Sequence, residues 1–194
     1  MFPQYIVYIS LFTSTFAGYF YIRDTLHGTT KPNRASWTIW FVAPIIASII
    51  SFTKGGGISA LPVFMAGFIP FLVILASFWN KNAYWKLGIL DYICFFFALF
   101  SVAAWIFLQE GVLATICAIL ADFIAFIPTY IKSWRAPETE TLSSYYSGSF
   151  NALLSISTLS AVTFNTAGFA IYLLFGNLLE VFIVLFRRKL TKIK

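Results

Sequence analysis

Long blocks of apolar residues follow one another along this sequence and limit the folds that are open to it. Each block is about 18 to 23 residues long, enough for a helix to cross a hydrocarbon core of roughly 30 Å. Only helices and closed barrels satisfy their backbone polar groups in lipid, and these blocks are too long for barrel strands. A soluble helical core would show polar faces at helical spacing, which the blocks lack. The sequence therefore predicts an all-α integral membrane protein.

Seven transmembrane helices fit these blocks. The connections between them hold from three to twelve residues, which leaves no room for a soluble domain. The composition agrees, because 60% of the 194 residues are hydrophobic and only 10% are charged, whereas about a quarter of a soluble domain is charged. The expected helices are Pro3–Ile22, Ala35–Phe52, Ile58–Trp79, Leu87–Leu108, Val112–Trp134, Leu142–Leu159 and Gly168–Phe186.

Lys and Arg residues gather on one side of the expected helices. Lys54 alone falls on the other side. Because basic loops stay in the cytoplasm, we expect an odd number of spans, with the N-terminus outside and the C-terminus cytoplasmic, in a bacterial inner (plasma) membrane. The basic-side residues are Arg23, Lys31, Arg34, Lys81, Lys86, Lys132, Arg135, Arg187, Arg188, Lys189, Lys192 and Lys194.

The net charge of +6 and the tryptophans fit the same orientation. The charge sits in loops and the tail, where it indicates orientation and contact with anionic lipid, so we expect no nucleic-acid partner. Four tryptophans fall on the basic side and predict an interfacial aromatic belt. These are Trp37, Trp79, Trp85 and Trp134.

An internal repeat relates the first three expected helices to the last three. A shift of 109 residues lays Tyr21 on Tyr130 and makes helix ends and basic flanks coincide, although identities are few. Because three is odd, one further helix must join two repeats of the same orientation. We therefore expect a 3+1+3 arrangement: a three-helix bundle at 1–79, a linker helix at 80–111, and a second bundle with a basic tail at 112–194. Parallel repeats place a site between the bundles near the midplane.

Three local stretches resemble the SWEET and PQ-loop transporter superfamily, of which this chain would be a divergent member. Ile127–Trp134 is similar to the PQ-loop stretch, with Thr129 where the signature has Gln. Thr141–Ser144 is similar to the Ser-rich entry of that family's sixth helix. Phe175–Leu179 looks like the Pro-Asn-x-x-Gly segment, with Gly176 in place of Pro.

The resemblance implies transport by alternating access, in which two bundles rock around a midplane site. It makes Asn177 a substrate-contacting amide and makes Pro44 and Pro128 hinges, although simple kinks explain these prolines almost as well. The first repeat departs from the pattern, because Tyr19 stands where a second PQ-loop proline would be and Phe68 stands opposite Asn177.

The candidate site residues lie at membrane depth. Asp122, Asn151, Asn177 and Trp40 are candidates for substrate binding, and Asp122 and Glu180 are candidates for proton coupling. A carboxylate at the bilayer centre is costly, so it should face the bundle interior or a wet cavity. Structural alternatives remain open for three of them: a polar clasp between helices for Asp122 and Asn151, and belt or core packing for Trp40.

Glu180 has its own structural alternative, a hydrogen bond or salt bridge at an inner gate with Arg23 or Lys132. Its position about 10 Å before the Arg187 and Arg188 pair, at 1.5 Å per residue, puts it in the basic-side half of its helix. The sequence does not decide between this structural role and proton coupling.

The leading hypothesis is a carrier, either a uniporter or a proton-coupled transporter of a small polar solute. The alternative is a non-transporting polytopic membrane protein, such as a receptor or an assembly (scaffold) subunit. We expect no enzyme activity, because clustered nucleophile motifs are lacking, and no cofactor or metal site. A retinal protein is excluded, because Gly168–Phe186 holds no lysine for a Schiff base. The expected partners are the solute and the lipid bilayer, and a homo-oligomer is left open.

Overall fold

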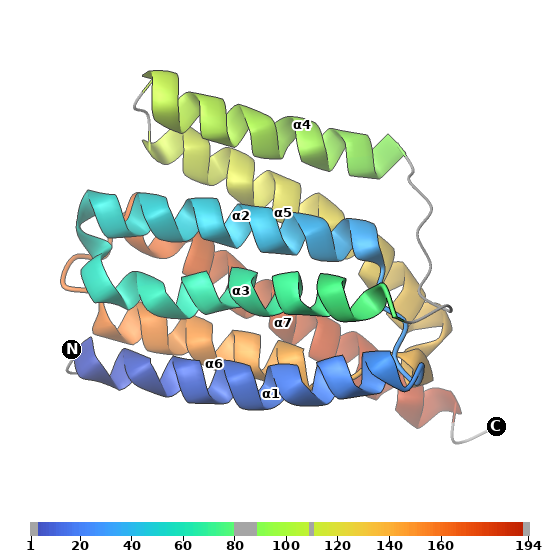
Figure 1. Ribbon diagram of the computed structural model, residues 1–194. Coiled ribbons are helices and arrows are strands. Elements are labelled where there is room, and N and C mark those ends of the chain that lie inside the picture. The colour runs from blue at the N-terminus through green and yellow to red at the C-terminus, as the bar shows by residue number, and fades with distance from the viewer. Residues whose placement is uncertain (1–3, 80–88, 109–110, 192–194) are drawn as a thin grey trace.

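The computed structural model describes residues 4–79, 89–108 and 111–191. These residues form helices joined by short turns, and none of them lies in a strand, so the all-α class is confirmed. The helices run alternately in opposite directions (Figure 1). They are α1 (Ile9–Leu26), α2 (Arg34–Ser51), α3 (Leu61–Ser77), α4 (Ile89–Ala103), α5 (Gly111–Arg135), α6 (Ser143–Thr158) and α7 (Phe164–Thr191). Short helical turns lie at Gln4–Tyr8, Phe52–Gly56, Gly57–Ala60, Ala104–Leu108 and Pro137–Thr139.

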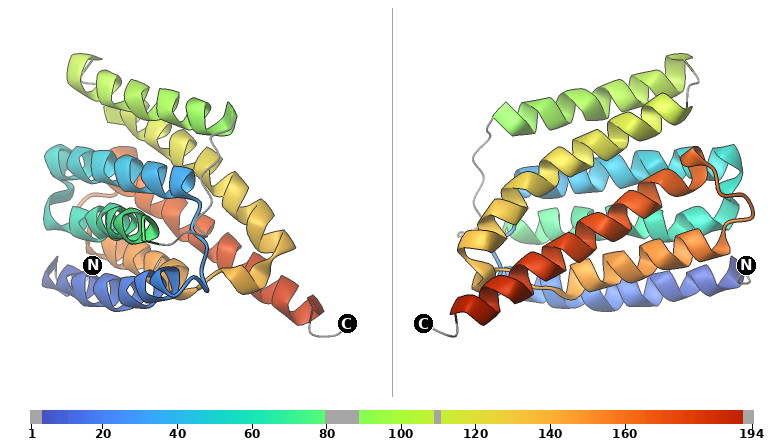
Figure 2. Two further views of the ribbon diagram at one scale, coloured as in Figure 1. Left: turned by 45° about the vertical axis from the view of Figure 1, so that its right-hand side comes forward. Right: turned by 180° about the vertical axis from the view of Figure 1, so that it is seen from behind.

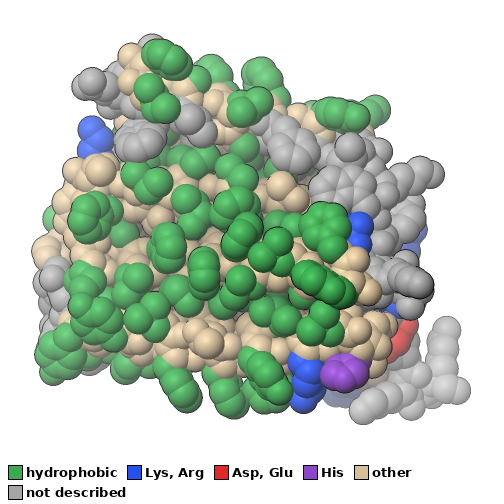
Figure 3. All heavy atoms as spheres, in the orientation of Figure 1, with side chains coloured by type: hydrophobic (Ala, Val, Ile, Leu, Met, Phe, Trp, Pro, Cys, Tyr) green, Lys and Arg blue, Asp and Glu red, His purple; other side chains and the backbone are tan. Residues whose placement is uncertain are grey.

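Four stretches of the described residues are long and apolar enough to cross a membrane. They are Tyr5–Leu26, Arg34–Ser77, Gly111–Arg135 and Phe164–Leu190, and the second covers α2, α3 and the turn between them. Hydrophobic side chains cover the middle of the face in Figure 3, while Lys and Arg lie toward its ends. The long apolar helices support the expected association with a membrane.

The two ends of the bundle differ in charge. At one end, which we call the basic end, α1, α3, α5 and α7 finish, and Arg23, Arg34, Lys132 and Arg187 lie there. Lys54 lies at the opposite end, in the turn between α2 and α3. The expected basic residues at positions 81, 86, 192 and 194 are outside the described residues.

The helix ends differ from the sequence expectation mainly in α7, which begins before Gly168 and continues past Phe186. Its start is fixed by Thr163 and Thr166, because the backbone N–H of each points at the hydroxyl of the other, at 2.9 and 3.3 Å. Its end is extended by Arg187, whose Nε donates to the carbonyl of Trp134 at 2.7 Å. Residues on both sides of the apolar run, which we expected to lie in loops, are therefore part of α7.

Helices α3 and α7 occupy equivalent places in the packing. Helix α3 packs against α1 and α2, and α7 packs against α5 and α6. Further contacts join α1 to α6, α2 to α5, α3 to α6 and α2 to α7. Helix α4 lies at the edge of the bundle against α5 (Figure 2) and also touches α2.

Close approach of α2 and α3 depends on Gly67. A Cβ atom there would lie 2.9 Å from the backbone oxygen of Phe41 and 2.9 Å from Cγ1 of Ile45. Small residues of this kind allow helices to pack closely in lipid. Gly18 on α1 differs, because its Cβ would meet only the flexible side chain of Ile69, also at 2.9 Å.

We expect Gly67→Ala to lower the free energy of unfolding by about 1 kcal/mol, because overpacking costs more than the helix gains from alanine. Gly18→Ala is the matched control and should be close to neutral, because Ile69 can change its rotamer. Unfolding of the purified variants in mixed micelles measures both changes. Equal losses in the two variants would contradict the role of the Phe41 carbonyl.

Candidate functional site

A cavity lies in the middle of the bundle and is lined by α1, α2, α3, α5, α6 and α7. Helix α4 contributes none of the described lining residues. The space between the lining side chains is about 580 Å³ when the open solvent at its mouth is counted with it. Five residues that the sequence singled out line it together: Trp40, Pro44, Asp122, Asn151 and Asn177.

Asp122 is fully buried at the middle of α5. Its Oδ2 accepts a hydrogen bond of 2.8 Å from the hydroxyl of Tyr172 on α7. Its Oδ1 has no hydrogen-bond partner among the described residues. The polar clasp to another helix thus forms through Tyr172, and not through Asn151 as the sequence suggested. One carboxylate oxygen remains for another ligand.

The Asn151 amide ties α6 to α1. Its Oδ1 accepts from the Thr13 hydroxyl at 2.7 Å, and its Nδ2 donates to Ser14 at 2.5 Å and to Ser147 at 3.1 Å. The structural alternative for Asn151 is therefore present in this conformation. Although Asn151 lines the cavity, its amide is already engaged by protein groups.

Asn177 sits where α6 and α7 approach each other closely. Its Nδ2 donates to the carbonyl of Leu173, one turn earlier on α7, at 2.7 Å. Gly148 on α6 makes room for it, because a Cβ at Gly148 would lie 2.8 Å from Oδ1 of Asn177. The position of the Asn177 amide at the cavity therefore depends on a glycine on the facing helix.

Aromatic rings cluster on the basic-end side of the cavity. Trp40 has its ring centroid 4.6 Å from that of Phe126 on α5 and 6.3 Å from that of Tyr145 on α6. The Trp40 Nε1 has no hydrogen-bond partner among the described residues. Trp37, which we placed in an interfacial belt, is instead buried and packs against Tyr21 at 4.5 Å. Its ring is therefore part of the hydrophobic core and not of an interfacial belt.

Trp79 and Trp134 are exposed near the basic end, as a belt would require, whereas Trp85 lies outside the described residues. For these two residues the aromatic belt stays a prediction.

Glu180 is fully buried one turn beyond Asn177 on α7 and is not among the described residues that line the cavity. Its Oε1 accepts a hydrogen bond from the Ser133 hydroxyl of α5, and its Oε2 has no hydrogen-bond partner among the described residues. Arg23, one of the partners we considered for it, pairs with Asp24 at 2.8 Å. The hydrogen-bonded alternative therefore forms with a serine and not with a basic residue.

Glu140 is a buried carboxylate that sequence reasoning missed. It forms an ion pair with Lys132 and accepts a hydrogen bond of 3.0 Å from the Tyr21 hydroxyl. Arg188 on α7 donates to the Glu140 backbone carbonyl at 2.6 Å. A carboxylate in a short polar connection looks solvated in a sequence, and only the folded chain shows that α1, α5 and α7 enclose it. Ion pairs and hydrogen bonds of charged residues therefore join α1, α5 and α7 at the basic end.

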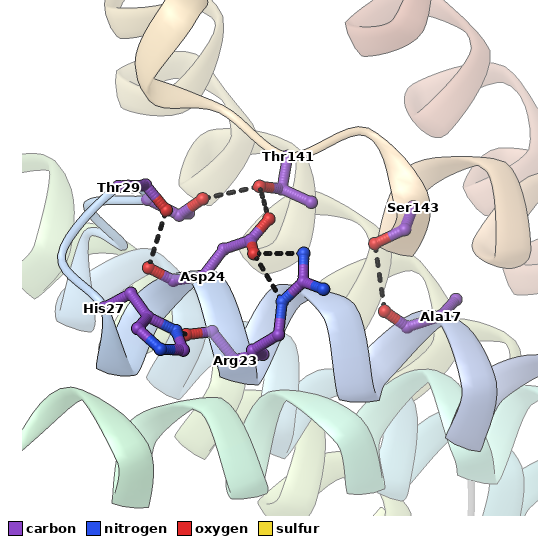
Figure 4. Close-up of polar contacts among 8 residues, drawn as sticks. Ala17, Arg23, Asp24, His27, Thr29, Thr141 and Ser143 are labelled. Carbon is purple, nitrogen blue, oxygen red and sulfur yellow. Dashed lines mark hydrogen bonds and ion pairs between the residues drawn. The ribbon is translucent and has the colours of Figure 1, made fainter.

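Asp24 joins α1 to the start of α6 at the same end (Figure 4). Its Oδ2 accepts from the Thr141 hydroxyl at 2.9 Å, and Thr141 also shares a hydrogen bond of 2.5 Å with Thr30. Nearby, Ser143 donates to the carbonyl of Ala17 at 2.9 Å. These bonds connect segments more than a hundred residues apart in the chain.

At the opposite end, serine hydroxyl groups donate hydrogen bonds to backbone carbonyls of distant segments. Ser51 donates to the carbonyl of Thr166 at 3.2 Å, and Ser59 donates to the carbonyl of Thr158 at 2.9 Å. Ser155 in turn donates to the carbonyl of Ser59 at 2.6 Å. These contacts join α2 to the start of α7, and the Gly57–Ala60 turn before α3 to the end of α6.

The two predicted hinges lie in different surroundings. Pro44 lies within α2 and lines the cavity, whereas Pro128 lies within α5 outside the cavity lining. Both remove a backbone hydrogen bond from their helix. Their hinge role stays a prediction.

No protein-family model matches the chain, and no match was found among curated proteins or among solved structures. Within the described part of the chain, His, Cys, Asp and Glu form no group of three or more that could hold a metal ion. The chemistry of the cavity is therefore argued from its own side chains.

Proposed function

We propose that this chain is a carrier of a small polar solute, working by alternating access between two three-helix bundles. In this proposal α1–α3 form one bundle, α5–α7 form the other, and α4 is the linker. The packing supports this division. Exchanging α1 with α5, α2 with α6 and α3 with α7 converts the observed set of contacts between these helices into itself. A pseudo-twofold arrangement would produce this correspondence.

A cavity between the proposed bundles, with buried polar atoms that lack partners, carries the proposal. Asp122 belongs to one bundle and Trp40 to the other, and each of these two lining residues has such an atom. An unsatisfied buried polar group is costly, and a carboxylate at membrane depth more so. A bound solute would supply the missing partners. Intramembrane carboxylates of this kind commonly mark transport pathways.

Alternation would break the contacts at the two ends in turn. At the basic end, Asp24 and Tyr21 of the first bundle bond to Thr141 and Glu140, which precede α6. At the opposite end, Ser51 of the first bundle bonds to the carbonyl of Thr166 in the second. We propose that the basic end is cytoplasmic, in agreement with the positive-inside rule, and that the N-terminus is outside. Membership in the SWEET and PQ-loop superfamily and location in a bacterial inner membrane are part of the same proposal.

Solute-dependent stabilisation followed by uptake tests the proposal. Purified protein is screened for thermal stabilisation by sugars, amino acids, vitamins and amines, and each solute that stabilises it is then offered to proteoliposomes. We expect at least one such solute to enter the proteoliposomes. We expect Asp122→Asn to reduce its uptake about tenfold or more, because a charged hydrogen-bond partner is lost. Glu138→Gln, at an exposed position near the basic end, is the matched control.

Proton coupling is tested in the same vesicles with an imposed pH gradient. If Asp122 or Glu180 carries the proton, Asp122→Asn or Glu180→Gln should abolish gradient-driven accumulation. Unchanged, pH-independent uptake in both variants would reject coupling and leave a uniporter. A solute that binds but never crosses the vesicle membrane would favour the receptor alternative, and a protein that binds none of them would favour a scaffold subunit.

A further inference from the structure

The cavity combines one carboxylate with aromatic rings and has no basic side chain among its described lining residues. Asp122 is fully buried, and the partner of its Oδ2 is the neutral hydroxyl of Tyr172. Its other oxygen has no hydrogen-bond partner among the described residues. Removing a carboxylate from water without a positive partner carries a large desolvation penalty. The lining therefore favours a solute that brings a positive charge.

The aromatic rings lie next to this carboxylate. Phe126 follows Asp122 by one helical turn on α5, so both side chains share one face of the helix. Trp40 packs against Phe126 from α2, and Tyr145 meets Trp40 edge-on from α6. The faces of such rings attract cations, and tryptophan does so best. The carboxylate and the rings together provide the two elements that bind an organic cation.

The remaining polar groups argue against a polyol. A sugar needs a donor or an acceptor for each of its hydroxyl groups, because buried unpaired groups are costly. In the cavity, the Asn151 amide is engaged by Thr13 and Ser14, and the Asn177 amide nitrogen is engaged by the Leu173 carbonyl. The hydroxyl groups of Ser144 and Tyr145 also line the cavity and have no hydrogen-bond partner among the described residues, but they are too few to pair every hydroxyl group of a sugar. An anion is disfavoured by the Asp122 carboxylate itself.

We propose that the solute is a small organic cation, an amine or a quaternary ammonium compound, held by Asp122 as its counter-ion and by the rings of Trp40 and Phe126. The Trp40 Nε1 donates to an oxygen of the solute, such as a hydroxyl. This inference rests on the proposed carrier function for the movement of the solute, but the binding site is defined by its lining alone.

Binding to purified protein tests the charge requirement directly. The probes are tetramethylammonium, choline and the neutral carbon isostere of choline, in which a quaternary carbon replaces the nitrogen. Glucose serves as the polyol. We expect choline to raise the melting temperature and its neutral isostere to bind about tenfold more weakly or worse. This comparison uses the unmodified protein, so it does not depend on the folding of any variant.

Two variants then locate the site. Asp122→Asn should remove the preference for choline over its isostere, and Trp40→Leu should weaken choline binding several-fold. Glu138→Gln, which removes an exposed carboxylate, should bind choline like the unmodified protein. Equal binding of choline and its isostere, or binding of glucose alone, would overturn the inference and leave the carrier function standing. Binding of choline without uptake would support the site and overturn the carrier function.

Discussion

Lys132→Met is expected to destabilise the protein more than Glu140→Gln, although the two residues form one ion pair. Breaking a buried pair by removing one partner costs about 3–5 kcal/mol. Loss of the lysine leaves the Glu140 carboxylate buried, with the Tyr21 hydroxyl as its remaining side-chain partner among the described residues.

Glu140→Gln has a smaller expected effect for two reasons. The glutamine oxygen still accepts the hydrogen bond from Tyr21, and Lys132 reaches solvent because a quarter of its side chain (25%) is exposed. We expect a loss of about 1–2 kcal/mol for Glu140→Gln and of at least 3 kcal/mol for Lys132→Met. The measurement is the free energy of unfolding in mixed micelles.

A double variant checks that the effect belongs to the pair. Adding Glu140→Gln to Lys132→Met should recover much of the lost stability, because the uncompensated carboxylate is then gone. Lys189→Met, at an exposed position on the last turn of α7, is the control for removal of a positive charge. A larger loss for Glu140→Gln than for Lys132→Met would show that the pair does not govern this end of the bundle.

The helices could be predicted from the sequence because, in lipid, the backbone N–H and C=O groups of each apolar run must form hydrogen bonds within that run. The same contrast makes polar residues conspicuous, which is why Asp122, Asn151 and Asn177 could be singled out by position alone. Their partners could not be predicted, because Tyr172 and Thr13 come from other helices and carry ordinary side chains. The functional roles of these residues stay predictions.

Expectations from the sequence were wrong where the burial of a side chain depends on which neighbouring helices cover it. Glu140 looks like a solvated loop residue, yet it is buried by the ends of α1, α5 and α7. Trp37 has the sequence position of an interfacial tryptophan, yet its side of α2 faces the core. Both errors arise because hydropathy gives distance along the membrane normal and carries no information about which connection or which helix face is covered by neighbouring helices.

The second large effect is expected where α6 and α7 meet. Gly148→Ala would place a Cβ 2.8 Å from Oδ1 of Asn177, so the amide must turn away. Turning breaks its 2.7 Å bond to the Leu173 carbonyl and moves a polar group that lines the cavity. Overpacking and the lost bond together should cost about 2 kcal/mol in stability. Affinity for a solute that binds in the cavity should fall about tenfold.

Asn177→Ala provides the matched test of this mechanism, because it removes the amide with which the new methyl group collides. The double variant Gly148→Ala/Asn177→Ala should be more stable than Gly148→Ala alone, although it carries one more substitution. Solute affinity should not recover in the double variant if the Asn177 amide contacts the solute. Recovery of affinity together with stability would instead show that Asn177 serves packing between α6 and α7, and that the contact with solute lies with Asp122 and Trp40.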